Sequence, residues 1–196
     1  ITPFNFPLNL VAHKVAPAIA AGCSVILKPS SLTPLIAIKL GEILQEAGLP
    51  AGVLNIIFGS GDTVGNWLVT ERRIALISFT GSPPVGKSIK EKSGLKKVVL
   101  ELGSNSAVIV DETANLNSAL SRCIIGGFSY AGQSCISVQR IYVQKNIYDQ
   151  FEKSAVEGVK KLKVGDPLNK DTDVGPMISE IEAKRIETWV NEAVQQ

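Results

Sequence analysis

Short apolar runs alternate along the chain with stretches whose apolar residues recur at helical spacing. In residues 7–21, Leu8, Val11 and Val15 follow the period of one helix face, and residues 23–27 form an apolar run of strand length that only Ser24 interrupts. The same alternation continues to the end of the chain. It predicts helices over residues 7–21, 33–48, 62–70, 82–94, 116–130, 147–162 and 179–196, and strands over residues 23–27, 53–58, 74–79, 98–102, 107–110 and 137–143.

Uninterrupted apolar strands between amphipathic helices indicate a parallel sheet covered by helices on both faces, so the predicted class is α/β. Ligands of such sheets bind beyond the carboxyl ends of the strands. Four successive predicted strands are followed there by polar or glycine-rich turns: Lys28, Gly59-Ser60-Gly61, Thr80-Gly81-Ser82 and Glu101. We therefore expect a ligand site at this edge of the sheet.

The pattern of predicted elements changes after Gly103. In this later part of the chain, a polar loop rich in Gly and Pro over residues 164–176 separates the predicted helices and strands from the last helix. We predict a first domain over residues 1–102 and the start of a second over residues 103–196.

The helix predicted over residues 33–48 has a start signal in its sequence. Thr33 is expected to cap the helix with its side chain, and Pro34 is expected in the first turn.

The composition excludes several classes of protein. The chain has 196 residues, 45% of them apolar, which suits one sizeable core or two small ones. The longest apolar runs have only strand length, so no membrane-spanning helix is expected. Twenty basic and eighteen acidic residues give a net charge of +2 without a long basic run, so nucleic-acid binding is unsupported. Since the chain starts on Ile1 and ends inside a helical pattern, we expect both ends to be cut.

Three cysteines, Cys23, Cys123 and Cys135, leave an odd thiol and lack the spacing of a metal site, so no metal is expected. This cysteine usage suits a reducing cytoplasm. Cys23 opens an apolar strand and Cys123 lies in a helix, and we expect both to be core residues. The only histidine, His13, is expected to be a helix-surface or packing residue rather than a catalytic one.

Three further residues have side chains suited to acyl chemistry and lie in turns marked by Gly or Pro: Asn5, Glu101 and Cys135. A thiol attacks a carbonyl carbon, an amide holds the resulting oxyanion, and a carboxylate activates the water that releases the acyl group. Each has a simpler alternative, namely a turn residue for Asn5, an ion pair with lysine for Glu101 and a small buried side chain for Cys135. Glu101 follows an apolar strand, so we expect apolar surroundings for its carboxylate.

The whole chain resembles the middle of an NAD(P)-dependent aldehyde dehydrogenase. The resemblance rests on motifs in the family's order: Pro3-Phe4-Asn5-Phe6-Pro7, Ile26-Leu27-Lys28-Pro29-Ser30, Phe79-Thr80-Gly81-Ser82, Glu101-Leu102-Gly103-Ser104, Gly132-Gln133-Ser134-Cys135 and Gly165-Asp166-Pro167. It implies a Rossmann-like cofactor domain, followed by the first part of a catalytic domain, and oxidation of an aldehyde to a carboxylic acid with NAD or NADP. It also implies a cytoplasmic homo-oligomer that binds neither nucleic acid nor membrane.

The same resemblance assigns roles to individual residues. Cys135 matches the nucleophile, Glu101 the general base of deacylation and Asn5 the oxyanion amide. The implied cofactor-binding residues are Pro3, Phe4, Lys28, Ser31, Gly61, Gly81 and Ser82. Ser82 stands at a helix start, where backbone N–H groups face anions.

Two positions depart from the family pattern: Ser104 replaces a glycine, and Ser31 stands where NAD-preferring members often carry glutamate. Two other functions stay open, a CoA-acylating relative and a non-catalytic nucleotide-binding or structural fragment. Glu101 favours hydrolysis, because CoA-acylating members commonly lack that glutamate. The segment around Cys135 is similar to lactaldehyde- and glyceraldehyde-type members. We expect the isolated chain to have little activity.

Overall fold

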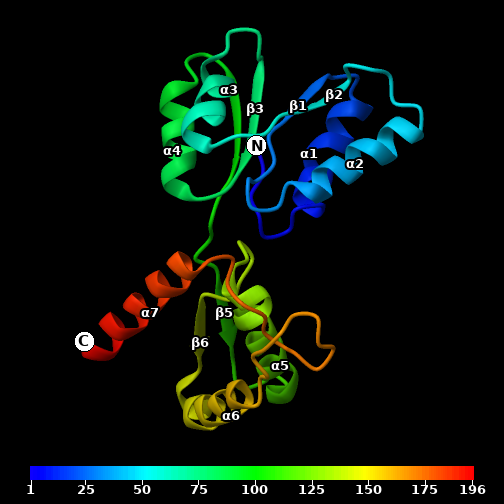
Figure 1. Ribbon diagram of the computed structural model, residues 1–196. Coiled ribbons are helices and arrows are strands. Elements are labelled where there is room, and N and C mark those ends of the chain that lie inside the picture. Colours follow the sequence, from blue (N-terminus) through cyan, green and yellow to red (C-terminus); the bar gives the residue numbers. More distant parts are fainter. The chain divides into compact units, whose positions relative to one another are not determined.

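The computed structural model describes residues 1–196, and the chain divides into two compact units, Ile1–Leu102 and Gly103–Gln196. Figure 1 shows that both units combine helices with short strands. All three strand pairs are parallel, which confirms the α/β class predicted from the sequence. No helix combines the length and the apolar character needed to cross a lipid bilayer.

The first half of unit 1 follows the predicted helix–strand alternation. Its elements are α1 (Asn9–Ala20), β1 (Val25–Leu27), α2 (Leu35–Glu46) and β2 (Leu54–Ile56). β1 pairs with β2 with Val25 opposite Leu54. Val11 and Val15, one turn apart on α1, are buried with Leu27 of β1 and Ala37 of α2. The helical spacing of these valines therefore produces the core that holds β1.

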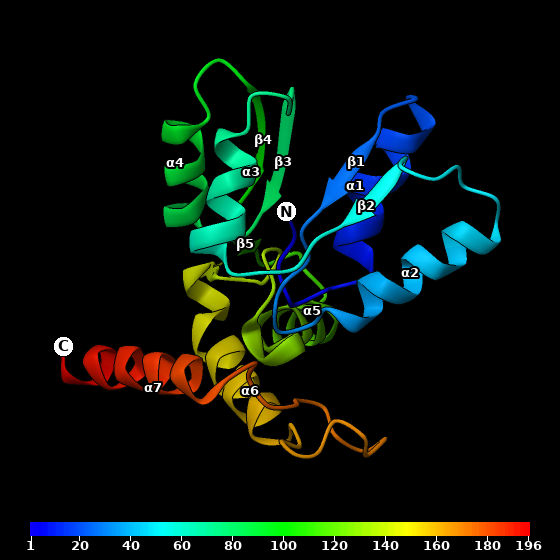
Figure 2. The ribbon, with the colours of Figure 1, turned by 45° about the horizontal axis from the view of Figure 1, so that its top comes forward.

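The second half of unit 1 has its own strand pair and core. Its elements are a π-helical turn η1 (Gly61–Gly65), α3 (Asn66–Thr70), β3 (Leu76–Thr80), α4 (Pro83–Lys92) and β4 (Lys97–Glu101). β3 pairs with β4 from Leu76 opposite Lys97 to Thr80 opposite Glu101. The core consists of Val69, Ile77, Phe79 and Ile89. Figure 2 shows α1 and α2 beside β1 and β2, and α3 and α4 beside β3 and β4.

The predicted parallel sheet of this unit is present as two parallel strand pairs, and Ile1 and Thr2 make hydrogen bonds toward both of them. The Ile1 amino group donates to the Ser78 carbonyl oxygen at 2.9 Å, and Thr80 N–H donates to the Ile1 carbonyl oxygen at 3.2 Å. On the other side, Thr2 N–H donates to the Lys28 carbonyl oxygen at 3.1 Å. Since only two residues bridge β3 to the end of β1, no fifth strand forms between the pairs.

Unit 2 is a parallel strand pair with helices. Its elements are β5 (Ala107–Val110), α5 (Leu116–Phe128), a 3-10 turn η2 (Ser129–Gly132), β6 (Arg140–Val143), a 3-10 turn η3 (Lys145–Ile147), α6 (Tyr148–Lys160) and α7 (Glu180–Gln195). Val110, Cys123 and Phe151 form its core. Gly158 allows close packing between helices, because a Cβ there would lie 2.3 Å from Ile124 of α5.

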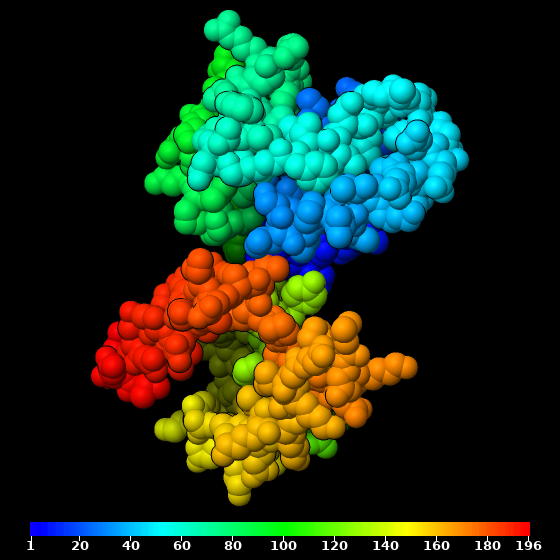
Figure 3. All heavy atoms as spheres, in the orientation of Figure 1, coloured from blue at the N-terminus to red at the C-terminus, as the bar shows by residue number.

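Helix α7 lies on the surface of its unit, as the space-filling view in Figure 3 shows in red. It begins at the N-cap Ser179, whose hydroxyl accepts a hydrogen bond from Glu182 N–H at 3.3 Å. Four large apolar side chains of this helix are exposed: Ile181, Trp189, Val190 and Val194. The helix predicted from residue 179 is confirmed, and its apolar side chains are not buried within unit 2.

Three local predictions are wrong. Thr33 makes no capping hydrogen bond, and α2 begins after Pro34 instead. Cys23 was expected in the core but is exposed, because the chain turns at Gly22, which has a φ of 74°, before β1 begins. The strand predicted from residue 137 begins only at Arg140, because Val138 N–H donates to the Gly126 carbonyl oxygen of α5 instead of extending the pair.

Candidate active site

The turn before α1 contains Asn5, the predicted oxyanion amide. The first helical hydrogen bond runs from Leu10 N–H to the Phe6 carbonyl oxygen at 2.9 Å, so the helical geometry starts directly after Asn5. Asn5 is partly buried, as are Pro3 and Phe4 beside it. Prolines on both sides restrict the backbone of this turn, which keeps the amide in one place.

Glu101, the predicted general base, is the last residue of β4 and is paired in register with Thr80 of β3. Its side chain is exposed, which corrects the apolar surroundings expected from the sequence. The alternation along β4 explains the difference, because it buries Val98 and Leu100 in part and turns Lys97, Val99 and Glu101 outward. An exposed carboxylate has direct access to water.

Lys14 of α1 was not singled out by the sequence analysis, yet it is close to this carboxylate. Its Nζ donates to the Ser78 hydroxyl of β3 at 2.9 Å. Burial lowers the pKa of Lys14, and the negative charge of Glu101 partly opposes that shift. The sequence did contain a signal for this position. Lys14 follows Val11 by three residues, and this spacing places it toward the buried side of the helix. Unit 1 therefore brings an ammonium, a hydroxyl and a carboxylate together.

The carboxyl ends of β1 and β2 form the first of the predicted cofactor surfaces. The Ser31 hydroxyl donates to the Gly59 carbonyl oxygen at 3.1 Å, which ties the turn after β1 to the turn after β2. A cavity of about 430 Å³ opens between them. It is lined by Ser31, Pro34, Ile38, Phe58, Gly59 and Ser60. Two serines and an apolar wall thus face the same space.

Gly59 is required in this surface. Its φ of 150° is rarely adopted by residues with a side chain, and a Cβ would lie 2.3 Å from the Val64 side chain. The next residue, Ser60, accepts a hydrogen bond from Thr63 N–H at 3.1 Å and so caps η1. Gly61 is the first residue of η1 and has open space around its Cα.

Lys28 lies at the end of β1 but not in the lining of this cavity. The residue is buried, its Nζ donates to the Pro29 carbonyl oxygen at 3.3 Å, and burial lowers its pKa. At the end of β3, Gly81 N–H donates to the Glu101 carbonyl oxygen at 3.0 Å. Ser82 then serves as the extended N-cap residue of α4, with Pro83 in the first turn as predicted.

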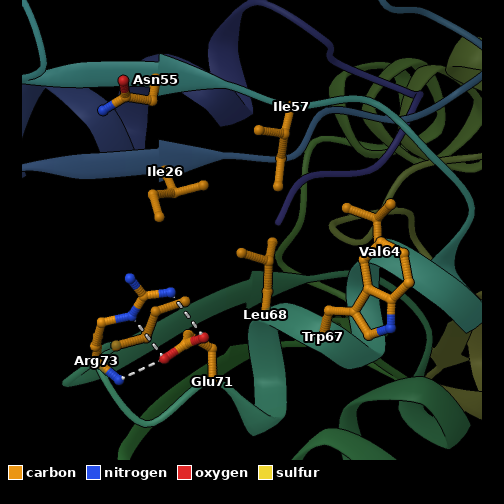
Figure 4. A pocket seen from close by; sticks show the side chains of 9 residues that line it. Ile26, Asn55, Ile57, Val64, Trp67, Leu68, Glu71 and Arg73 are labelled. Carbon is orange, nitrogen blue, oxygen red and sulfur yellow. Dashed lines mark hydrogen bonds and ion pairs between the residues drawn. The ribbon is translucent and has the colours of Figure 1, made fainter.

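A second hollow in unit 1, a groove of about 290 Å³, lies beside β1, β2 and α3 (Figure 4). Its polar side holds the ion pair between Arg73 and Glu71, whose Nε and Oε1 atoms are 2.9 Å apart. Its apolar lining consists of Ile26, Ile57, Val64, Trp67, Leu68 and Ile74. None of the predicted site residues lines this groove.

Cys135, the predicted nucleophile, lies in unit 2 on the loop between α5 and β6, and it is partly buried. Two non-glycine residues before it, Tyr130 and Ala131, adopt left-handed backbone angles with φ of 59° and 55°. Such angles are costly for residues with a Cβ and cluster at functional sites. After the cysteine, the chain returns to α5 through the Val138–Gly126 hydrogen bond described above. Asn5 and Glu101 belong to unit 1.

The remaining cysteines behave differently from each other. Cys123 is buried in α5 as expected, and burial raises the pKa of its thiol. Cys23 is exposed, and His13 is exposed on α1 as expected. No group of three or more His, Cys, Asp or Glu side chains is arranged to hold a metal ion.

The sequence profile of the aldehyde dehydrogenase family matches residues 1–196. The chain belongs to this family. The chain is 53% identical over 196 residues to the 3-sulfolactaldehyde dehydrogenase of Priestia aryabhattai, covering all of this chain and 41% of that protein. The resemblance found in the sequence motifs is thereby confirmed, and the chain spans about two fifths of the length of such relatives.

Two solved aldehyde dehydrogenases show the same fold. A glyceraldehyde-3-phosphate dehydrogenase from Methanocaldococcus jannaschii in complex with NADP has a TM-score of 0.94 at 45% identity, covering 99% of this chain and 44% of that one. A betaine aldehyde dehydrogenase from Staphylococcus aureus in complex with NAD+ has a TM-score of 0.94 at 38% identity, covering 97% and 38%. Both nicotinamide cofactors therefore occur among close structural relatives.

Proposed function

We propose that this chain is the central part of an NAD(P)-dependent aldehyde dehydrogenase that oxidises its substrate through a thioester on Cys135. The observation that carries the proposal is the Cys135 loop, in which a partly buried thiol follows two left-handed residues. A backbone held at this cost a few residues before a thiol suits a nucleophile whose position matters.

The chemistry follows from three side chains. The Cys135 thiolate attacks the aldehyde carbon, and the oxyanion formed accepts hydrogen bonds from the Asn5 amide and from the Cys135 backbone N–H. A bound nicotinamide would supply the acceptor for the hydride of that carbon, and Cys135 would then carry the acyl group as a thioester. Glu101 then takes a proton from water, the resulting hydroxide attacks the thioester carbon, and the carboxylic acid leaves as the thiol is restored.

Two features of unit 1 support these roles. Exposure of Glu101 gives its carboxylate direct access to the water that it must deprotonate. Lys14 lies near this carboxylate, and its Nζ donates to the Ser78 hydroxyl at 2.9 Å, so its position beside Glu101 is fixed. Hydrolysis rather than transfer to CoA is favoured because Glu101 is present and near water.

The carboxyl edge of unit 1 fits a dinucleotide. Ile38 and Phe58 offer an apolar wall of the kind that holds an adenine ring, and Ser31 and Ser60 place hydroxyl groups at its rim. A Cβ at Gly59 would fill the space beside Val64, so the glycine keeps the turn open. We assign the pyrophosphate to the start of α4, near Gly81 and Ser82, where Val85 supplies the first backbone N–H of the helix because Pro83 and Pro84 have none. Lys28 at the end of β1 is assigned to the adenosine ribose.

The names of two relatives support a proposal for the substrate class. The proteins named for 3-sulfolactaldehyde and glyceraldehyde-3-phosphate act on short 2-hydroxy aldehydes that carry an anionic group at the far end. We propose the same class for the protein that carries this chain. The three free thiols also suit the cytoplasm, where cysteines stay reduced. The homo-oligomer implied by the family resemblance stays a prediction.

The Cys135→Ala variant tests the proposal in a protein that carries this chain at the length of its relatives. We expect aldehyde-dependent NAD(P)H formation to fall by at least about a thousandfold, because no thioester can form. Cofactor binding, measured by fluorescence titration, is expected to stay within about threefold of the native protein. Cys23→Ala is the matched control and is expected to keep full turnover. Substantial turnover by Cys135→Ala would refute the mechanism.

A further inference from the structure

The Gln133 side chain connects the loop before Cys135 with the segment before α7. Its Nε2 donates to the Tyr130 carbonyl oxygen at 3.1 Å, and its Oε1 accepts from Ile178 N–H at 3.0 Å. The two partners are separated from each other by 48 positions in the sequence. Ile178 lies directly before Ser179, the N-cap of α7. One amide thus uses both of its polar ends to join two distant backbone segments.

The segment that Gln133 holds is the strained one. Tyr130, Ala131 and Gly132 have φ values of 59°, 55° and 72°, so three consecutive residues are left-handed. Only the glycine adopts this region without a steric cost. A strained turn persists when surrounding contacts determine its conformation. The Gln133 backbone N–H also donates to the Tyr130 carbonyl oxygen at 3.1 Å, so that single oxygen receives both Gln133 donors.

The remaining contacts of the loop lie on its other side. Ser137 N–H donates to the Ser134 carbonyl oxygen at 3.2 Å, and Ser137 itself is buried. Together with the Val138–Gly126 bond, these contacts attach the end of the loop to α5. The side-chain link through Gln133 restrains its beginning. Cys135 lies between the two attachments.

We propose that Gln133 is a positioning residue that holds the Cys135 thiol in place by fixing the left-handed turn against the start of α7. The inference rests on the proposed function for its catalytic meaning. Its structural content, a restraint on the Cys135 loop, can be measured without any turnover. Gln133 acts through the backbone of Tyr130 and Ile178 and takes no part in bond making.

The test uses the rate at which iodoacetamide alkylates each cysteine of the 196-residue chain, resolved by peptide mass analysis. Exposed Cys23 reports on the reagent, and buried Cys123 reports on global unfolding. Gln133→Met keeps the length of the side chain and removes both hydrogen bonds. Gln144→Met is the matched control, because Gln144 Oε1 accepts from Glu112 N–H at 2.9 Å elsewhere in unit 2.

In Gln133→Met we expect alkylation of Cys135 to accelerate by at least about fivefold, as the loss of one or two net hydrogen bonds implies. Cys23 and Cys123 should react as in the native chain, and Gln144→Met should leave all three rates unchanged. A Cys135 rate within about twofold of native, with Cys123 still protected, would overturn the inference. If Cys123 also becomes reactive in Gln133→Met, the chain has unfolded and a second variant, Gln133→Glu, provides the test. This variant keeps the acceptor for Ile178 N–H and loses only the donor to the Tyr130 carbonyl oxygen. In Gln133→Glu, faster alkylation of Cys135 alone supports the inference, and an unchanged Cys135 rate refutes it.

Turnover separates this inference from the proposed function. In the protein that carries this chain, a more reactive but misplaced thiol should lower kcat by about tenfold or more with a smaller change in KM. If Cys135→Ala stays active, the proposed function fails while the alkylation result still stands. If Cys135→Ala is inactive and Gln133→Met alters neither alkylation nor kcat, the function stands and the positioning role fails.

Discussion

At the scale of single residues, the exposure of Glu101 bears on the role of general base proposed for it. The carboxylate is exposed at the end of β4, and Lys14 reaches toward it from α1 while donating to Ser78. An exposed carboxylate can contact water directly, as the base proposed for thioester hydrolysis must.

Replacing Glu101 by Gln is therefore expected to slow thioester hydrolysis more than thioester formation. In a protein of the relatives' length, rapid mixing should show a burst of NAD(P)H followed by a steady rate lowered by about a hundredfold or more. Glu112→Gln, at an exposed carboxylate of unit 2, is the control and should behave as native. An unchanged steady rate would assign the base to another residue.

At the scale of elements, the turns after β1 and β2 are joined by one hydrogen bond, from the Ser31 hydroxyl to the Gly59 carbonyl oxygen. Ser31 also faces the cavity proposed for the adenosine. A glutamate at this place would accept hydrogen bonds from ribose hydroxyls and repel a 2′-phosphate. Serine removes that repulsion, so we expect the site to accept NADP+ as well as NAD+.

Ser31→Glu should consequently shift the ratio of kcat/KM for NADP+ over that for NAD+ by at least about tenfold toward NAD+. Ser31→Ala separates the two effects, because it loses the bond to Gly59 without adding a charge, and its ratio should change by less than about threefold. If the native protein strongly prefers NAD+ and Ser31→Glu leaves the ratio of the two kcat/KM values unchanged, then Ser31 does not set the cofactor preference through the adenosine ribose.

At the scale of the whole molecule, the two units present large apolar side chains that neither unit buries. Trp67 in the groove of unit 1 and Trp189 on α7 are 65% and 57% exposed, and Val194 near the end of α7 is 82% exposed. Contiguous exposed apolar surface favours association with further protein. The chain also spans only 41% of a relative with 53% identity.

The 196-residue chain by itself is therefore expected to self-associate and to oxidise aldehydes at less than about one hundredth of the rate of a relative. Sedimentation velocity over a range of concentrations measures the association. Trp189→Lys, which places a charge within the exposed face of α7, should shift the distribution toward the monomer, whereas Lys184→Arg on the same helix should not. Relative-like turnover from a monodisperse monomer would contradict this expectation.

Local patterns in the sequence determined most of the elements and the identity of the candidate groups. The spacing of Val11 and Val15 predicted α1, and the apolar runs located the strands to within a few residues, because periodicity and turn residues act over one or two turns of chain. The motifs around Asn5, Glu101 and Cys135 indicated the family that the comparisons confirmed. Their catalytic roles stay proposals.

Only the tertiary structure decided how those groups are surrounded. Several features depend on chain segments that meet only after folding. They are the exposure of Cys23 and Glu101, the contact of Lys14 with the Ser78 hydroxyl 64 residues away, and the hydrogen bond from Ile178 to Gln133 across 45 residues. The connection of the two strand pairs through the hydrogen bonds of Ile1 and Thr2 is likewise visible only in the folded chain. Burial, charge and backbone strain are properties of these non-local contacts, and no local pattern encodes them.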